Sequence, residues 1–315
     1  SNCDSVLLYN DMSNEKVTYL GRKKNNGTGT HFMWENRDIR YNVLRAVGYY
    51  KGKAVVEDIL VLNGLEQAPH FGILYQDTKP LLKGEDGYNY LYRINCGGDD
   101  FTDSFGQLWM QDNTNYSRSW ATSFNELNPY LASQRTTSDP IRGSRDWKLF
   151  QHFRFGRHQL EYNFPVADGM YRIEFYFTEP WHGTGGSASA DCEGLRIFDV
   201  AVNDSVVLDD LDIWAESGHD GACKKVVYAI VKGGLLKIHF PEVKAGQALI
   251  SGIAIASANS DSKPTLFPAS DWNWEKASKE VMEKTPKELL PEDKNARVSI
   301  AYEAEAAVLK GKFQK

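Results

Sequence analysis

Apolar and polar residues alternate in short runs along the first part of the chain, a pattern typical of β-strands rather than helices. Strands are predicted at residues 6–9, 17–20, 31–34, 43–50 and 54–62. Residues 24–27 (KNNG) form a turn signal, and Lys51, Gly52 and Lys53 separate two strand-like runs as a hairpin turn would. We therefore predict that residues 1–65 form a small antiparallel sandwich.

A longer set of strand-like runs occupies residues 88–258, after a proline-containing and glycine-containing linker at 66–87. These strands are predicted at residues 90–95, 149–155, 158–164, 169–177, 195–202, 206–211, 225–231, 234–240 and 248–256. No run between them has the period of a helix. This pattern predicts a second, larger β-sandwich of jelly-roll size.

The pattern changes after residue 258. An apolar stripe from residue 270 and a capping box at 285–288 (TPKE) predict short helices, so residues 259–297 are expected to form a helical linker. Residues 298–315 contain one more strand-like run, either the first strand of a further module or a strand that docks on this chain. The expected fold class is all-β with a short helical C-terminal extension.

Charge and length narrow the functional classes. With 36 basic and 42 acidic residues the net charge is −6, and no basic block is present that would suit nucleic acid or an anionic membrane. The longest near-apolar run, residues 248–256, is too short to span a bilayer. The chain starts at Ser1 without a leader, so we expect it to be a piece of a longer protein.

Known catalytic motifs are absent from the sequence. Aspartates gather at residues 99–103 and 209–212, without the spacing of a calcium loop, and are expected to be solvated turn residues. Paired carboxylates can hydrolyse glycosides, but their separation is not given by the sequence. We therefore predict no cofactor, no metal and no catalysis in this chain.

Aromatic residues are abundant: 8 Trp, 16 Tyr and 15 Phe make up 12% of the chain. Trp181 lies in a polar, glycine-rich segment, EPWHGTGG at residues 179–186, where core partners are scarce. A ring in such a loop can cap the core, or it can stack on the C–H face of a sugar.

Four cysteines are present and none forms a C-x-x-C pair. Cys3 and Cys96 lie beside predicted strands and are expected to be buried. Cys192 and Cys223 lie in polar segments, where they are either two unrelated thiols or, if the protein is exported, a disulfide.

Several motifs in one order resemble the malectin carbohydrate-binding domain across roughly residues 88–258. They are YRINCGG at 92–98, the segment from Asp103 to Trp109, GMYRIEFYFTE at 169–179, LRIFDVAVN at 195–203, DLDIW at 210–214 and ISGIAI at 250–255. Malectin domains are β-sandwiches that hold short glucose-containing oligosaccharides among loop aromatics and an aspartate.

The resemblance implies a carbohydrate site on particular residues of this chain. By position it falls on Trp181 with His182 and Glu179, on Phe155, and on Tyr116 or Trp120. The aspartate of the family falls at residues 244–247 (KAGQ), which contain no acid, and residues 183–193 form an insert.

Residues 1–65 resemble the immunoglobulin-like domain of bacterial glycoside hydrolase family 2 enzymes of β-galactosidase type. The similarity lies in SNCDSV at 1–6, Leu20-Gly21 and LRAVGYYKGK at 44–53. It implies the non-catalytic tail of a secreted or periplasmic polysaccharide-degrading enzyme, with oligosaccharide or polysaccharide and the catalytic domain of the same enzyme as partners. Two alternatives remain: a structural spacer without a sugar site, and a glycosidase that uses the aspartate clusters.

Overall fold

The computed structural model describes residues 3–27, 31–112, 121–122, 134–157, 160–183 and 191–265. Within these ranges the chain consists mainly of antiparallel strands with two short α-helices, so the predicted all-β class is confirmed. Tyr116, Trp120, the predicted strand at 298–315 and the predicted helical linker beyond residue 265 lie outside the described residues.

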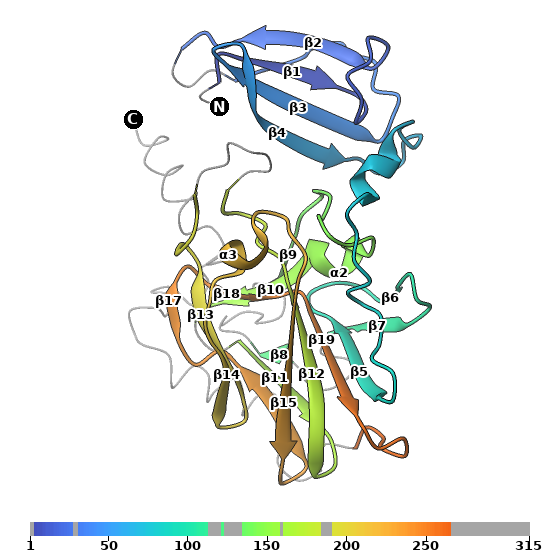
Figure 1. Cartoon of the computed structure of the whole chain (residues 1–315), viewed down its shortest axis with the longest axis vertical. Coiled ribbons are helices and arrows are strands. Elements are labelled where there is room, and N and C mark those ends of the chain that lie inside the picture. Colours follow the sequence, from blue (N-terminus) through green and yellow to red (C-terminus); the bar gives the residue numbers. More distant parts are fainter. Residues whose placement is uncertain are drawn as a thin grey trace, which may run out of the picture.

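The N-terminal unit is a four-stranded antiparallel sheet, drawn in blue at the top of Figure 1. Its strands lie in the order β2-β1-β3-β4, with β1 (Ser5–Tyr9), β2 (Tyr19–Lys24), β3 (Val43–Tyr50) and β4 (Lys53–Val61). The predicted hairpin is confirmed, because Lys51 and Gly52 join β3 to β4 with φ of 48° and 77°. Two successive positive φ values match the twist of the strands that such a turn connects.

The same unit differs from the predicted sandwich, since its described strands form one sheet rather than two facing sheets. Val43 is fully buried and belongs to an aromatic cluster with residues of the second unit, and Ile59 and Val61 pack beside it. Part of the apolar face of the sheet is therefore covered by the rest of the chain. The resemblance to an immunoglobulin-like domain stays a prediction.

The second unit contains two larger sheets (Figure 1). The first has the order β15-β12-β19-β5-β7-β6, with β5 (Asn89–Asn95), β6 (Phe101–Thr102), β7 (Leu108–Gln111), β12 (Gly169–Phe177), β15 (Cys223–Val231) and β19 (Gly252–Ser257). The second has the order β14-β13-β16-β11-β8, with β17 paired to β13. Its strands are β8 (Ala121–Thr122), β11 (Glu161–Pro165), β13 (Ile197–Val202), β14 (Ser205–Leu211), β16 (Leu235–His239) and β17 (Val243–Ala245).

Apolar side chains of both sheets form one core. Phe175 and Ile253 of the first sheet and Phe164, Phe198 and Ile238 of the second are fully buried members of the same cluster. Burial alternates along β16, whereas β12, β13 and β19 are buried almost throughout, so continuous apolar runs of strand length identify them in the sequence.

A small third sheet and the helices lie at the end of the sandwich that faces the N-terminal sheet (Figure 1). They are β9 (Gln134–Thr136), β10 (His152–Gly156) and β18 (Ala248–Ile250), with α2 (Trp147–Gln151) and α3 (Ile213–Ser217). The prediction of one strand over residues 149–155 was wrong in its first half, which belongs to α2. Trp147, Leu149 and Phe150 are all buried there, so the apolar run fills a helical turn covered on several sides.

The linker packs along the outer face of the first sheet. Phe71, which begins η1 (Phe71–Tyr75), and Leu82 are buried in the aromatic cluster with Trp147 and Tyr176. The N-terminal sheet is joined to the linker by His70, whose backbone N–H donates to Asp11 at 3.0 Å. The N-terminal sheet, the linker and the sandwich thus share packed contacts.

Candidate functional site

Trp181 lies just beyond the end of β12, and 42% of its surface is exposed. Its ring packs edge-on against Phe153 and Phe155, with centroids 5.8 Å apart in both pairs. Both phenylalanines are buried on β10. The tryptophan is therefore held along one side by the core while part of the ring remains accessible to a ligand.

Glu179 anchors the turn that carries Trp181. Its side chain is fully buried, and its Oε1 accepts hydrogen bonds from the backbone N–H groups of Trp181 at 2.9 Å and His182 at 3.1 Å. A carboxylate that accepts two successive backbone donors fixes the path of the chain where no strand partner does so. Pro180 then restricts φ immediately before the tryptophan.

Arg196 neutralises the buried charge of Glu179. Its Nη2 donates to Glu179 Oε1 at 3.2 Å, its Nε pairs with Oε2, and only 1% of the residue is exposed. Burial acts to raise the pKa of Glu179, but Arg196 and the two backbone donors outweigh it, so the pKa of the carboxyl is lowered.

Arg196 also reaches a third segment of the chain. Its Nη1 donates to the carbonyl of Gln247 at 2.6 Å, and its guanidinium carbon lies 5.9 Å from the centroid of the Trp181 ring. The residues that hold Trp181 therefore come from β10, from the segment after β12, from the residue before β13 and from the segment before β18.

His182 is half-buried beside this network. Burial and the nearby charge of Arg196 lower the pKa of its imidazole, against the opposing effect of Glu179. Because the lowered pKa favours the neutral ring at neutral pH, His182 can offer one nitrogen as donor and the other as acceptor.

The structure thus brings together four of the six predicted site residues: Glu179, Trp181, His182 and Phe155. Their roles differ. Trp181 and His182 have accessible surface, whereas Glu179 and Phe155 are buried and position the tryptophan.

Three supporting residues were missed from the sequence: Phe153, Arg196 and Gln247. Arg196 carried a usable signal, because an arginine at the start of a buried strand needs a carboxylate partner. Nothing in the sequence identified Glu179 as that partner.

The predicted disulfide is not formed: Cys192 and Cys223 are free thiols, and both are buried. The interpretation of Cys223 as a loop residue was wrong, because it begins β15, opposite Phe177, and belongs to the core. Burial raises its pKa to about 11. Cys3 and Cys96 are buried as predicted.

The prediction that the clustered aspartates are solvated was wrong for Asp103, which is buried and whose Oδ2 accepts a hydrogen bond from Trp109 Nε1 at 2.9 Å. A second aspartate of the clusters has a structural role too. Asp212 caps α3, and its Oδ1 accepts a hydrogen bond from the N–H of Ala215 at 3.0 Å. In the part of the chain that the structure describes, no helix is long and apolar enough to cross a membrane.

A double-sheet β-sandwich whose loops hold an aromatic ring has the architecture of a lectin-like binding module. Residues 90–259 match the malectin domain family, and the chain belongs to this family. The malectin of Danio rerio is 26% identical over 150 residues, which are 47% of this chain and 47% of that protein. The malectin of Mus musculus is 26% identical over 149 residues, 47% of this chain and 45% of that protein. The chain thus spans about half the length of the curated relatives it matches.

Two solved structures are also similar to this chain. A Bacteroides uniformis β-glucuronidase matches 81% of this chain with 26% of its own, at 22% identity and a TM-score of 0.43. The plant receptor-like kinase ANX1 matches 54% of this chain with 48% of its own, at 14% identity and a TM-score of 0.42.

Proposed function

We propose that the malectin domain of this chain binds oligosaccharide on the surface around Trp181. The observation that carries the proposal is the exposed, anchored ring of Trp181. Sugar rings present C–H groups to an aromatic face and hydroxyl groups at their edges, so a fixed ring with polar neighbours matches both parts of the ligand. The backbone N–H of His182 donates to the same Glu179 carboxylate, and the His182 imidazole can exchange hydrogen bonds with hydroxyls.

Anchoring favours binding because the ring loses little freedom when the ligand arrives. Glu179, held by Arg196, fixes the backbone at Trp181. Phe153 and Phe155 fix the indole ring through edge-on contacts on the core side. A preorganised contact avoids the ordering cost that a mobile loop would incur on binding.

The proposal is tested with the whole chain and the variant Trp181→Ala. A glycan array identifies the oligosaccharide, and isothermal titration then measures its affinity. Truncation of a central aromatic costs more than about 1 kcal/mol of binding, so we expect affinity to fall about tenfold. Trp34→Ala is the matched control, because Trp34 is a half-buried tryptophan beside Gly21 in the N-terminal sheet.

Stability must be measured beside affinity, since Trp181 both packs on the core and faces solvent. We expect Trp181→Ala to lower the melting temperature as well, and titrations are therefore made well below the midpoint of the variant. A loss of stability with unchanged affinity would contradict the proposed site and favour the spacer alternative.

We also propose that the chain is the non-catalytic region of a bacterial β-galactosidase-like enzyme of glycoside hydrolase family 2. The enzyme would be secreted or periplasmic and degrade polysaccharide through a catalytic domain outside this sequence. Support comes from the resemblance of residues 1–65 together with a carbohydrate-binding family in the same chain. We expect the purified chain to hydrolyse no aryl glycoside. Turnover that disappears when one Asp or Glu is replaced would favour the glycosidase alternative.

A further inference from the structure

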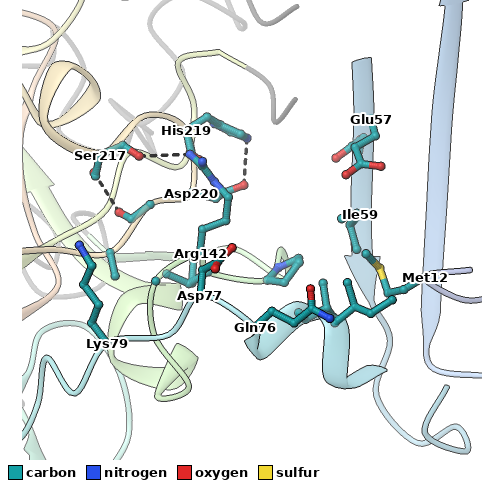
Figure 2. A pocket seen from close by; sticks show the side chains of 18 of the residues that line it. Met12, Glu57, Ile59, Gln76, Asp77, Lys79, Arg142, Ser217, His219 and Asp220 are labelled. Carbon is teal, nitrogen blue, oxygen red and sulfur yellow. Dashed lines mark hydrogen bonds and ion pairs between the residues drawn. The ribbon is translucent and has the colours of Figure 1, made fainter. Parts of the chain in front are cut away.

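A cavity of about 600 Å³ lies between β4 of the N-terminal sheet and the loop that follows α3 (Figure 2). Acidic side chains outnumber basic ones around it. The acidic residues are Glu57, Asp58, Asp77, Glu216 and Asp220, and the basic ones are Lys79 and Arg142, with His219 between them. The electrostatic character of the cavity therefore favours a cation.

One group of side chains at this cavity has the spacing of metal ligands. Asp139, His219 and Asp220 each offer a ligand atom, and these atoms all lie within 4.8 Å of one another. His219 Nε2 is 2.9 Å from Asp220 Oδ2. His219 and Asp220 line the cavity, as does Pro140, which directly follows Asp139.

The cluster leaves buried polar atoms unsatisfied. Asp220 is only 8% exposed, and its Oδ1 has no hydrogen-bond partner among the described residues. The same is true of His219 Nδ1. Since an unpaired buried polar atom costs stability, the Asp220 carboxylate calls for a partner that the protein groups around it do not supply.

Nearby basic side chains do not neutralise the carboxylates. In the described part of the chain neither Asp139 nor Asp220 has a lysine or arginine within ion-pair distance. Arg142 is close, but its Nη2 donates to the carbonyls of Ser217 at 3.1 Å and His219 at 2.6 Å. This nitrogen donates to backbone carbonyls rather than to the acids.

The backbone holds the donors in place. Arg142 N–H donates to the carbonyl of Asp220 at 2.8 Å, and Ala222 N–H donates to the carbonyl of Arg142 at 2.9 Å, which ties the two segments together. Asp139 Oδ2 accepts a hydrogen bond from the Thr137 hydroxyl at 2.9 Å, which orients the carboxylate. Preorganised donors with an oriented carboxylate are typical of metal sites.

We infer that Asp139, His219 and Asp220 form a binding site for a divalent transition metal, with Zn²⁺ as the ion that the donors suit best. Imidazole nitrogen and carboxylate oxygen are both zinc ligands, and three such protein ligands leave a fourth position for water or another ligand from the open cavity. Two ligands about 2.05 Å from Zn²⁺ at the tetrahedral angle are about 3.3 Å apart, so the contact between His219 and Asp220 has to open only slightly. Ca²⁺ needs six to eight oxygen ligands and is poorly served by this set.

The inference is tested by adding Zn²⁺ to metal-free, full-length protein. Isothermal titration and elemental analysis after gel filtration are expected to give one ion per chain at micromolar concentration. Co²⁺ in place of Zn²⁺ is expected to show the visible absorption of a tetrahedral site, and Ca²⁺ to bind at least tenfold more weakly than Zn²⁺.

Two conservative variants, Asp139→Asn and His219→Gln, are each expected to weaken Zn²⁺ binding at least tenfold. Circular dichroism verifies that each variant is folded before titration. Asp209→Asn is the matched control: Asp209 belongs to a second cluster with Asp199 and Asp210, in which Lys244 already pairs with Asp210. This control is expected to bind Zn²⁺ like the wild type.

Three results would overturn the site. They are the absence of Zn²⁺ uptake at micromolar concentration by the wild type, uptake that both Asp139→Asn and His219→Gln leave unchanged, and uptake that Asp209→Asn abolishes. None of these measurements depends on sugar binding, so the metal site and the carbohydrate site are tested independently.

Discussion

The buried pair of Glu179 and Arg196 permits a quantitative prediction. Replacing Arg196 with Met keeps much of the side-chain volume but removes the charge and all three donated hydrogen bonds. Glu179 then remains fully buried without a counter-charge. Removing one partner of a buried ion pair typically costs about 3–5 kcal/mol, and we expect the free energy of unfolding at neutral pH to fall by that amount.

The loss is expected to depend on pH in a particular direction. In the wild type the pKa of Glu179 is lowered on folding. Ionised Glu179 therefore stabilises the folded state above the unfolded pKa of about 4.3. This stabilisation is lost as the pH falls through the folded-state pKa. In Arg196→Met only burial acts strongly on the carboxyl, so its pKa is expected to rise above the unfolded value. A raised carboxyl pKa destabilises the folded state at neutral pH but not in acid. The free energies of unfolding of wild type and variant should therefore become more similar as the pH falls.

Urea unfolding at pH 7 and pH 4.5 measures both effects. With a slope of about 2 kcal/mol per molar urea, the midpoint of Arg196→Met should fall by about 1.5–2.5 M at pH 7 and by clearly less at pH 4.5. Arg40→Met is the control, because Arg40 pairs with Glu66 at the surface. This variant is expected to leave the urea midpoint unchanged. A loss below about 1 kcal/mol, or one that does not change with pH, would refute the assigned role of the pair.

Two further predictions concern other buried positions. Asp112 accepts hydrogen bonds from Arg154 Nε at 2.6 Å and Nη2 at 2.8 Å inside the sandwich, and Asp112→Asn removes its charge. The variant should lower the free energy of unfolding by about 3–5 kcal/mol in urea melts. A loss of less than about 0.5 kcal/mol would contradict the buried pairing. Gly48→Ala places a Cβ 2.5 Å from Cys3 Sγ and 2.6 Å from Val56 Cγ1. This overpacking should lower the free energy of unfolding by about 1–3 kcal/mol. An unchanged melting temperature would show that the N-terminal sheet relaxes around the added methyl group.

The sequence predicted most strands of the sandwich because their apolar runs have the length of strands and end at turn residues. In β12 the pattern is nearly continuous burial from Tyr171 onward, and its apolar run had no competing helical period. The start of β10 was missed because α2 is equally apolar and only five residues long, which is too short for periodicity to separate a helix from a strand.

The site was only partly predictable for a different reason. Trp181 was identified because proline and glycine around it marked a loop with few core partners. Arg196 and Glu179 are 17 residues apart, and His219 and Asp139 lie on separate loops, so their meeting depends on the register of the sheets. Pairings of that kind leave no local signal in a single sequence.

The two proposed sites meet at one stretch of backbone. Glu179 fixes the turn of Trp181 through its side chain, while its carbonyl accepts a hydrogen bond from Asp220 N–H at 2.9 Å. Glu179 therefore lies between the aromatic ring on one side and the cluster of His219 and Asp220 on the other. Gly183 follows with φ of 87°, and a Cβ there would lie 2.7 Å from Trp214 Nε1, so the turn has little room to adopt another path. Buried ion pairs contribute little net stability compared with apolar packing, but they can define one geometry where a loop has no strand partner. The pair of Glu179 and Arg196 therefore fixes the position of Trp181 rather than strengthening the core.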